Sequence, residues 1–391
     1  MKEKIAYLAF GHVDVTLPLI SEFEKNNLQY ELILCFSQNK KKESVIDFRD
    51  IVVPDGLLRP ECNSRLFVRE LLSYYSHLAH CRFFIFKNLK LKSLSNIFLA
   101  IELIWHLRNV HIIHLSGDDA MVPVIFFLSK IFRKKLIWTL HDYQPHSGER
   151  FSKHHGVIRP IAYKLADAIL LQNKSDLNIA GESNKQIKNK LHYLPFGILS
   201  LYKCFSAIEK PEYESNFLFF GRISTYKGLA ILYDAYLLVE KKYPAVKLTI
   251  AGSGYDETIT KWQTHKNVTV FNRYLNNQEI ASLINGTKIV ICPYTDVTQS
   301  GVLMTALAFN KPVLATRIGS FEEIFDTTGC GILVEPSDPV ALAAEMINLI
   351  EHPEKIKIIE RNIIRMMSDS EYAWKNIGNN LITIYEKIQK E

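Results

Sequence analysis

Short apolar runs alternate with helical patterns along almost the whole chain, and this alternation limits the fold more than any other feature. The runs of the first half are almost continuously apolar, as expected for strands of a parallel sheet that is covered on both faces. They span residues 5–10, 31–36, 110–115, 136–140, 168–172 and 191–194. Helical patterns lie between them, for example at residues 16–25, 121–132 and 174–187. This order is typical of βαβ units, so the pattern predicts an α/β fold.

The alternation breaks once, near the middle of the chain. Residues 195–215 show no clean periodicity and contain Gly197 and Pro211. Six further apolar runs follow, at residues 216–220, 247–251, 268–271, 289–292, 312–315 and 331–334. A chain of 391 residues is long enough for two domains. We therefore expect two doubly wound, Rossmann-like domains, which bind ligands at the carboxyl ends of their strands. The expected parts are residues 1–196, a linker at 197–215, a second domain at 216–370, and a last helix at 371–391.

Charge is unevenly distributed between the two halves of the chain. Residues 1–200 hold 27 basic and 19 acidic residues, whereas residues 201–391 hold 20 and 22. A basic first half favours an anionic partner, such as a phosphate, a lipid headgroup or a nucleic acid. A solvated basic surface is the alternative.

Cysteine usage and the apolar runs indicate the compartment. The six cysteines are scattered and form no C-x-x-C pair, which argues against a disulfide framework or a zinc site and favours a reducing compartment. The first residues lack the pattern of a signal peptide. No apolar run reaches the roughly 18 residues that a transmembrane helix needs. We therefore expect a cytoplasmic protein.

Residues 83–110 combine basic and apolar side chains. Lysines and arginines are interleaved there with phenylalanines, isoleucines and a tryptophan. Such a segment can form an amphipathic element that lies on an anionic membrane surface, on the inner membrane face for a cytoplasmic protein. The alternative is a helix that faces the core and carries basic residues on its solvent side.

The strongest chemical signal is the stretch Phe-Phe-Gly-Arg-Ile-Ser-Thr-Tyr-Lys-Gly at residues 219–228. An apolar strand ends there, and Gly221 lets the backbone approach a ligand closely. Arg222 offers a planar, permanently charged group that suits phosphate, and Lys227 adds a second positive charge just before a helix. The combination predicts a diphosphate site at a helix entrance.

A second anion site is expected where Ser300, Gly301 and Val302 open the helix that follows strand 289–292. The first backbone N–H groups of a helix have no partner within it and carry the positive end of its dipole. This site therefore needs no charged side chain.

Together these segments resemble the retaining, nucleotide-sugar-dependent glycosyltransferases of family 4, among the glycosyl transferases group 1. The matching stretches are residues 221–228, 251–254, 299–313 and 315–323, within about residues 216–350. The resemblance implies the GT-B architecture, in which two Rossmann-like domains face each other across a cleft and the last helix crosses back to the first domain. It also implies transfer of a hexose from a nucleotide diphosphate sugar.

The resemblance implies roles for individual residues. Arg222 and Lys227 hold the donor diphosphate, and the helix opening at Ser300 holds the distal phosphate. Arg273 and Tyr274 border the base. In the more divergent first half, Gly11 begins a strand-to-loop turn that contributes to substrate binding.

His141 is a further candidate for catalysis. It stands at the carboxyl end of strand 136–140, where it can donate a hydrogen bond to the donor sugar or to developing phosphate charge. A loop histidine that only bonds to the backbone is the alternative.

The chain departs from the family at its paired glutamates, which are eight positions apart and fall here on Val297 and Thr305. Neither residue is a carboxylate. Thr305 can still bond to a ribose hydroxyl, and Asp296, one residue earlier, can take over the sugar contact. The departure also motivates the alternative of a non-catalytic homologue that binds nucleotide sugars.

The function expected is therefore sugar transfer, with retention, to a hydroxyl acceptor in polysaccharide or glycolipid assembly. A lipid-linked or other anionic acceptor at a membrane face fits the basic first half. We expect no metal and no cofactor, because basic residues and helix dipoles can neutralise the diphosphate. No G-x-G-x-x-G follows the first strand, which argues against a dinucleotide enzyme. Nucleic-acid binding is disfavoured, because the basic residues form no aromatic-interleaved stripe outside residues 83–110.

Overall fold

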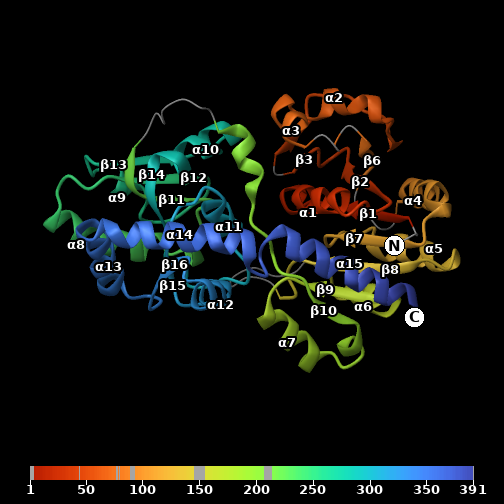
Figure 1. Cartoon of the computed structure of the whole chain (residues 1–391). Helices are drawn as coiled ribbons and strands as arrows, with labels where there is room; N and C mark the ends of the chain where they lie inside the picture. The colour runs from red at the N-terminus through yellow and green to blue at the C-terminus, as the bar shows by residue number, and fades with distance from the viewer. Residues whose placement is uncertain are drawn as a thin grey trace. The chain divides into compact units, whose positions relative to one another are not determined.

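The protein folds into two compact units. The structure is a computed structural model of the whole chain, and it describes residues 4–43, 45–75, 78, 80–88, 93–144, 155–206 and 214–390 (Figure 1). The first unit comprises Met1–Phe196 and Trp374–Glu391, and the second comprises Gly197–Ala373.

The first unit is built on a sheet whose strand order is β10-β9-β8-β7-β1-β2-β6-β5. All its strands run parallel except β5, which pairs antiparallel with β6. The strands are β1 (Ile5–Ala9), β2 (Tyr30–Ser37), β5 (Gly56–Leu57), β6 (Arg82–Phe86), β7 (Ile112–Ser116), β8 (Lys135–Leu140), β9 (Ala168–Leu171) and β10 (Leu191–Tyr193). Strand β1 pairs with β2 on one side and with β7 on the other. The chain therefore adds strands in one direction before β7 and in the opposite direction from β7 onward.

Helices cover both faces of this sheet. The longer helices are α1 (Val13–Lys25), α4 (Leu94–His106), α5 (Val122–Ile131), α6 (His155–Leu165), α7 (Lys174–Ser183) and α15 (Trp374–Lys390). Alternate residues of a strand point to opposite faces. Ala6 and Leu8 of β1 pack in one core cluster with residues of α4 and α5. Tyr7, between them, contacts Phe23 of α1 instead. Helix α15 packs against α1.

Smaller elements complete the first unit. They are the helices α2 (Asn63–Leu66) and α3 (Arg69–Tyr74), the 3₁₀ helix η3 (Leu107–Asn109), and a two-stranded sheet of β3 (Lys42–Glu43) and β4 (Ile46–Asp47).

The second unit has a six-stranded, wholly parallel sheet of order β13-β12-β11-β14-β15-β16. Its strands are β11 (Ser215–Phe220), β12 (Leu248–Gly252), β13 (Val268–Asn272), β14 (Thr287–Cys292), β15 (Val313–Thr316) and β16 (Gly331–Val334). Counted within the unit, this is the order 3-2-1-4-5-6 of a Rossmann fold. Both sheets thus have the predicted doubly wound, α/β form.

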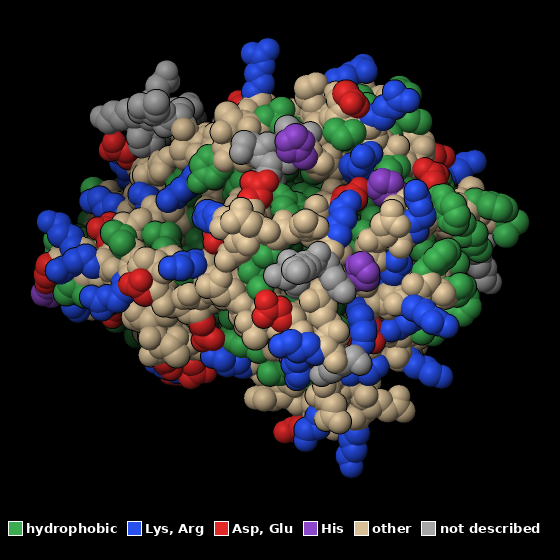
Figure 2. All heavy atoms as spheres, turned by 45° about the vertical axis from the view of Figure 1, so that its right-hand side comes forward, with side chains coloured by type: hydrophobic (Ala, Val, Ile, Leu, Met, Phe, Trp, Pro, Cys, Tyr) green, Lys and Arg blue, Asp and Glu red, His purple; other side chains and the backbone are tan. Residues whose placement is uncertain are grey.

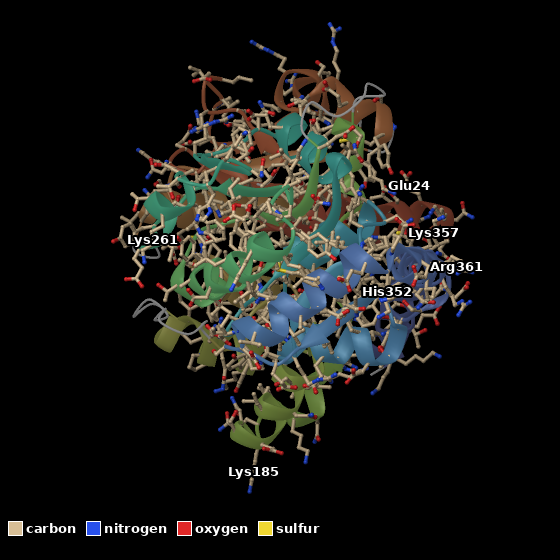
Figure 3. All side chains as sticks on the ribbon, turned by 90° about the vertical axis from the view of Figure 1, so that its left-hand side faces the viewer. Glu24, Lys185, Lys261, His352, Lys357 and Arg361 are labelled. Carbon is tan, nitrogen blue, oxygen red and sulfur yellow. The ribbon has the colours of Figure 1, made fainter. Side chains whose placement is uncertain are left out.

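The helices of the second unit are α8 (Leu229–Lys242), α9 (Ile259–Trp262), α10 (Asn277–Gly286), α11 (Gly301–Ala308), α12 (Gly319–Thr328), α13 (Pro339–Glu351) and α14 (Pro353–Asp369). Helix α14 shows why they fold against the sheet. Ile359, Ile363 and Met366 are buried on one side, whereas Lys357 and Arg361 point outward from the other (Figure 3). This spacing of three and four residues is the amphipathic pattern of a surface helix.

Two sequence expectations differ from the structure. Residues 82–86 form strand β6 in the interior of the sheet, and Phe83, Phe84 and Phe86 are fully buried. The prediction that these three side chains lie on a membrane is therefore wrong. The basic residues near both ends of this strand made the sequence pattern look amphipathic, so the short core strand was not predicted.

The second difference concerns the expected linker. Residues Ser200–Phe205 form a 3₁₀ helix, η5, that packs on α10 and α11, so they are part of the second unit. Residues 207–213 of the expected linker, and residues 89–92 of the segment 83–110, lie outside the described residues.

Candidate functional site

The second sheet changes its winding direction between β11 and β14. In doubly wound sheets, ligands bind outside the carboxyl ends of the strands at this point. Strand β11 ends at Phe220, and strand β14 ends at Cys292. The loops that follow them carry the residues that the sequence singled out, from Gly221 to Gly228 and from Asp296 to Val302. The fold therefore brings both predicted anion motifs to one edge of one sheet.

A pocket of about 300 Å³ opens beside this edge, over the ends of β11, β12 and β13. It is lined by Tyr202, Phe220, Gly221, Arg222, Ala251, Gly252, Ser253, Arg273, Tyr274, Leu275, Ile280 and Leu283. Gly252 makes the floor flat: its φ is +153°, and a Cβ there would lie 1.7 Å from the carbonyl oxygen of Gly221. A mostly apolar slot with a main-chain floor suits a planar ring.

Arg222 reaches out from the end of β11. The side chain is exposed, and its guanidinium donates to the Tyr226 hydroxyl at 3.2 Å while lying 5.9 Å from the centre of that ring. The tyrosine supports the guanidinium with a neutral hydroxyl and the face of its ring. The positive charge is thus held at the mouth of the pocket.

Lys227 lies deeper in the same loop and is 9% exposed. Its Nζ atom is 3.8 Å from the centre of the Tyr294 ring and 5.1 Å from that of Tyr226. Burial is the main cause that lowers the pKa of this ammonium to about 8, and the charge of Arg222 lowers it as well. Contacts with two aromatic rings compensate a buried cation only in part, so an incoming anion would stabilise its charged form.

Helix α11 begins opposite this loop. A Cβ on Gly221, whose φ is +114°, would lie 2.9 Å from Cγ2 of Val302, so the helix start lies close against the end of β11. Ser300 caps the helix, and its hydroxyl accepts from the amide of Leu303 at 3.2 Å. In the described part of the chain, the amides of Gly301 and Val302 have no acceptor. They are the donors expected to bind a phosphate at a helix N-terminus.

Two buried polar atoms beside these loops also lack partners among the described residues. They are the hydroxyl of Ser224, in the Arg222–Lys227 loop, and the amide nitrogen of Gln299, just before the α11 cap. Native proteins rarely leave buried polar groups unsatisfied, and such groups often mark a ligand site. Both atoms belong to the loops that carry the phosphate-directed residues.

Arg273 and Tyr274 border the pocket, but the charge of Arg273 is already paired. Its guanidinium binds Glu279 with two contacts of 2.5 and 3.1 Å, and Glu279 also completes the capping box of α10. Tyr274 is more than half exposed. Both residues shape the wall of the pocket and leave phosphate binding to the neighbouring loops.

The positions of the missing glutamates are occupied by buried residues. Val297 is 7% exposed, and Thr305 is 3% exposed. The Thr305 hydroxyl donates to the carbonyl of Gly301 at 2.7 Å, within its own helix. Asp296 is half-buried on the loop before α11, so it is the carboxylate that this loop offers near the helix start.

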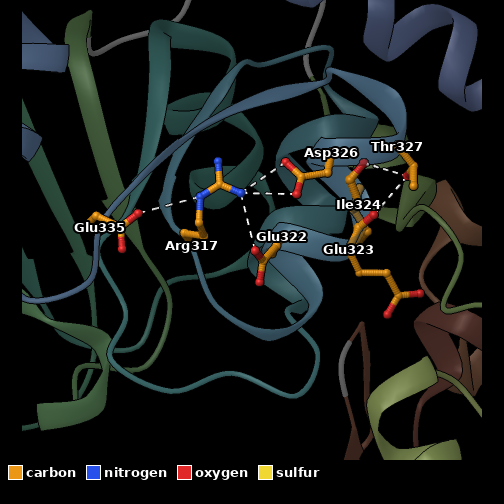
Figure 4. Close-up of polar contacts among 7 residues, drawn as sticks. All are labelled: Arg317, Glu322, Glu323, Ile324, Asp326, Thr327 and Glu335. Carbon is orange, nitrogen blue, oxygen red and sulfur yellow. Dashed lines mark hydrogen bonds and ion pairs between the residues drawn. The ribbon is translucent and has the colours of Figure 1, made fainter.

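Arg317, in the matching stretch 315–323, does not add to the phosphate-directed charge. Its guanidinium lies 3.4 Å from Glu322, 3.2 Å from Asp326 and 3.8 Å from Glu335 (Figure 4). Three carboxylates thus surround one cation. Its role is to join the start of α12 to the end of β16.

In the first unit, the predicted residue His141 stands just beyond the end of β8. It is 6% exposed, and both ring nitrogens have partners. Nδ1 donates to the Gln172 side-chain oxygen at 2.6 Å, so Nε2 accepts from the Ser116 hydroxyl at 3.0 Å. Burial, with the neighbouring His12, holds the pKa of His141 well below its ordinary value. The ring is neutral and fixed.

His12 was missed by the sequence analysis, although it follows Gly11 directly. Its ring stacks on that of His141, with centroids 3.5 Å apart. It has φ +51° and precedes α1, after the turn at Gly11 that ends β1. Left-handed backbone in a non-glycine residue is uncommon and is a signal of function. From sequence, only the adjacent Gly11 hinted at it.

The described residues were also searched for metal sites and for membrane-spanning helices. Within the described residues, no group of three or more His, Cys, Asp or Glu side chains is placed to hold a metal ion. A search of the same residues finds no helix with the length and hydrophobicity required to cross a bilayer.

The geometry can now be compared with known proteins. Residues 214–352 match the model of the family Glycosyl transferases group 1. The second unit is a Glycosyl transferases group 1 domain. The matched residues contain both phosphate-directed loops and the residues given above for the pocket except Tyr202.

Two relatives each match less than half of the chain. The chain is 26% identical over 177 residues to the uncharacterized glycosyltransferase MJ1607 of Methanocaldococcus jannaschii, covering 44% of this chain and 45% of that protein. It is 24% identical over 182 residues to a D-inositol 3-phosphate glycosyltransferase of Corynebacterium urealyticum, covering 44% of this chain and 42% of that protein. The chain thus spans less than half the length of these relatives.

A solved structure extends the likeness beyond the group 1 domain. HepE of Anabaena in complex with UDP has a TM-score of 0.66 and 17% identity, and the match covers 98% of this chain and 100% of that chain. At this identity the likeness shows the fold. The chain has the GT-B fold of glycosyltransferases.

Proposed function

We propose that the protein is a glycosyltransferase that moves a sugar from a nucleotide diphosphate sugar to a hydroxyl acceptor. The observation that carries the proposal is the convergence at the β11–β14 edge. Two cations, Arg222 and Lys227, and the open amides of α11 lie on adjoining loops there. Breaking the bond to the sugar leaves negative charge on the diphosphate, and fixed donors aimed at that charge lower the barrier.

The residues have distinct roles in this proposal. Arg222 and Lys227 neutralise the diphosphate, and the amides of Gly301 and Val302 bind its distal phosphate. The pocket over β12 and β13 takes the base against Tyr274 and Arg273. Asp296 contacts the sugar, and Thr305 packs below the ribose site.

The first unit provides the acceptor side in this proposal. Gly11 makes room at the end of β1, and His12 meets the substrate. His141 holds His12 by stacking, since its own nitrogens are already bonded. His141 is thus proposed as a positioning residue.

The finer assignments follow from the family that the chain resembles. They are retention of configuration, as in family 4, and an acceptor that is lipid-linked or otherwise anionic, used in polysaccharide or glycolipid assembly. We place the reaction in the cytoplasm, at the inner membrane face. UDP is a fitting nucleotide, since the HepE structures contain UDP and UDP-glucose. No metal or cofactor is required in this proposal, because protein cations and helix amides face the diphosphate.

A non-catalytic homologue that binds nucleotide sugars is the second candidate, and it has its own observation. Val297 and Thr305 stand where the family it resembles carries glutamates, and both are buried. Such a protein would bind nucleoside diphosphates with the same loops. It would release no sugar from any donor.

The test measures binding and turnover separately. We expect Arg222→Ala and Lys227→Ala each to weaken nucleoside diphosphate binding about tenfold or more, because each removes a charged hydrogen-bond donor. Calorimetry across several nucleoside diphosphates gives the affinities, and sugar release from the matching donors gives the turnover. Lys241→Ala, on the exposed side of α8, is the matched control.

The outcomes separate the two candidates. Unchanged nucleoside diphosphate affinity in both variants would show that the proposed phosphate site is wrong. Tight binding that depends on Arg222 and Lys227, with no turnover of any donor or acceptor, favours the non-catalytic homologue.

A further inference from the structure

Eight large apolar side chains are exposed on three neighbouring helices of the first unit. They are Leu94, Phe98, Ile101 and Trp105 of α4, Phe127 and Ile131 of α5, Phe132 just after α5, and Ile161 of α6. Helix α5 packs against both α4 and α6, so these side chains share one face. We name this set the α4–α6 surface. Contiguous exposed apolar patches on soluble proteins mark interaction sites.

Helix α4 shows that the surface differs from an ordinary solvent face. Its exposed apolar residues recur at intervals of four, three and four, so they form one stripe. Its opposite side, with Ala100, Leu103 and Ile104, is buried in the core. A helix that is apolar on both sides is normally covered on both sides.

A groove connects the three helices. It is lined only by apolar residues, namely Ile97, Pro123, Val124, Phe127, Leu128, Ile158 and Ile161. Figure 2 shows hydrophobic side chains gathered at the right-hand edge of that view, with Lys and Arg side chains next to them. The apolar area is therefore continuous across helices that are far apart in the sequence.

Three basic residues lie beside the surface, whereas the acidic Asp167, just after α6, is paired with Lys130 of α5. Arg108, Arg133 and Lys135 lie near the carboxyl ends of α4 and α5, and none has an acidic side chain within 4 Å among the described residues. In the described parts of α4, α5 and α6, the one acidic residue is Glu102. Its carboxylate accepts from the Leu57 amide of β5 instead of facing this surface.

Trp105 stands where the apolar and basic parts meet. It is 61% exposed, and the Arg108 guanidinium lies 5.5 Å from the centre of its ring. Tryptophan combines a large apolar ring with a polar N–H group, and it is enriched where lipid tails meet headgroups. Arginine beside it can reach phosphate while its stem stays in the apolar layer.

We propose that the α4–α6 surface docks on an anionic lipid bilayer, with its apolar side chains among the headgroups and its basic residues on lipid phosphates. This deepens the proposed function, since it identifies the face that would bring an acceptor membrane to the enzyme. A second copy of the chain is a poorer occupant, because a symmetric contact sets the same basic residues against each other. A bilayer offers apolar depth and negative charge together.

The proposed membrane-binding residues differ from those expected from the sequence. Of the segment 83–110, only the part from Leu94 to Arg108 contributes. Helices α5 and α6, from outside the segment, supply the remainder. The buried strand β6 supports this layer from below.

The test is flotation of the full chain with liposomes of phosphatidylcholine alone or mixed with phosphatidylserine, at low and high salt. We expect binding to the mixed liposomes that weakens with salt. Phe98→Ser with Phe127→Ser should abolish it. Arg108→Gln, Arg133→Gln and Lys135→Gln together should weaken it about a hundredfold, from roughly fivefold per basic residue.

Helix α14 supplies the matched controls, because it carries exposed Ile358, Ile364, Lys357 and Arg361 in the other unit. Ile358→Ser with Ile364→Ser, and Lys357→Gln with Arg361→Gln, should leave binding unchanged. Tryptophan emission gives a direct readout, since Trp138 and Trp262 are fully buried, Trp374 is partly buried, and Trp105 is exposed. Mixed liposomes should shift the emission to the blue, and Trp105→Phe should reduce that shift.

The outcomes are decisive in both directions. Equal binding to both liposomes, no binding to either, or equal losses in the α14 controls would overturn the proposal. A dimer in sedimentation that Phe98→Ser with Phe127→Ser dissociates, without lipid binding, would assign the surface to a second copy. Nucleoside diphosphate affinity reports on the proposed function independently, and melting temperatures of all variants show whether each one folds.

Discussion

At the scale of single residues, Lys227 is the most unusual group of the site. Its ammonium is buried against the faces of Tyr294 and Tyr226, and its pKa is lowered to about 8 from 10.5, mainly by burial. Cation–π contacts compensate only part of the lost hydration. The residue therefore costs stability when it is charged and unliganded, and a bound phosphate would recover that cost.

We predict that nucleoside diphosphate binding is coupled to proton uptake by Lys227. The diphosphate raises the pKa of the ammonium above about 8, so affinity should fall as pH rises through 8, by up to about tenfold per pH unit. Calorimetry between pH 7 and 9.5, in buffers that differ in ionisation enthalpy, measures both the affinity and the protons taken up. Lys227→Arg, which stays charged, should flatten this dependence.

The matched comparison is Arg222→Lys, in the same loop but exposed. Its ammonium should behave as an ordinary solvated lysine and leave the wild-type pH dependence in place. An affinity that is constant from pH 7 to 9.5 in the wild type would contradict the coupling.

The sequence could place this loop but not its electrostatics. Gly221, Arg222 and Lys227 lie within seven positions of one another, so the strand end and helix start that hold them were visible locally. The rings beside Lys227 include that of Tyr294, which lies in the loop after a different strand, β14. His12 was missed for the same reason: its stacking partner His141 is held by Ser116 at the end of β7 and by Gln172 just after β9.

At the scale of elements, one device recurs three times in the described chain. A lysine just before a strand bonds to the carbonyls at the end of the helix that precedes the neighbouring strand. Lys134 bonds to Arg108 and Val110, beside η3. Lys311 bonds to Asn285 and Thr287 at the end of α10, at 2.9 and 2.8 Å. Burial lowers the pKa of both ammonium groups.

Lys190 is the third case, and it bonds to three carbonyls at the end of α6. Its Nζ atom donates to Tyr163, Lys164 and Ala166 at 3.2, 3.1 and 2.8 Å. The last carbonyls of a helix have no partner within it, and they carry the negative end of its dipole. The device therefore ties each helix end to the second strand that follows that helix in the chain.

We predict that Lys190→Met destabilises the first unit by about 1–2 kcal/mol, because the Tyr163, Lys164 and Ala166 carbonyls lose a charged donor. Lys188→Met, two residues earlier and exposed, should cost less than about 0.5 kcal/mol. Urea unfolding followed by circular dichroism measures both. Equal losses in the two variants would show that the carbonyl contacts do not matter.

Element boundaries were mostly predictable, and β6 shows where prediction failed. The other core strands are apolar runs that begin and end in polar or turn residues. Strand β6 is a similar apolar run, but the basic residues near it made the whole stretch look amphipathic. Its burial comes from pairing with β2 and β5, which local periodicity cannot reveal.

At the scale of the whole molecule, the resemblance implied a last helix that crosses back to the first domain, whereas local periodicity gives neither this return nor the order of the strands. The first unit contains both ends of the described sequence, because α15 returns to it after the second unit. The apolar face of α15 closes the core over α1. The side chains that make this closure specific are polar, and they come from residues 271 positions apart in the sequence.

His114 of β7 is the centre of that contact. Its Nδ1 atom is 2.6 Å from the Tyr385 hydroxyl of α15, and its Nε2 atom is 2.7 Å from the Thr139 hydroxyl of β8. The ring is fully buried, and burial lowers the pKa of His114 to about 3, so it stays neutral. One nitrogen must donate and the other must accept, and each has a suitable partner.

We predict that Tyr385→Phe destabilises the first unit by about 1–3 kcal/mol, because it leaves a buried nitrogen of His114 without a partner while keeping the aromatic packing. Tyr30→Phe is the matched control, since its hydroxyl bonds to Glu24 at the exposed edge of the same unit, and it should cost less than about 1 kcal/mol. Chemical unfolding followed by near-ultraviolet circular dichroism measures both losses. Nucleoside diphosphate affinity should stay at the wild-type value in Tyr385→Phe, because the proposed diphosphate-binding residues all lie in the second unit. A loss of stability no larger than that of Tyr30→Phe would show that packing alone, without the hydrogen bond, holds α15 in place.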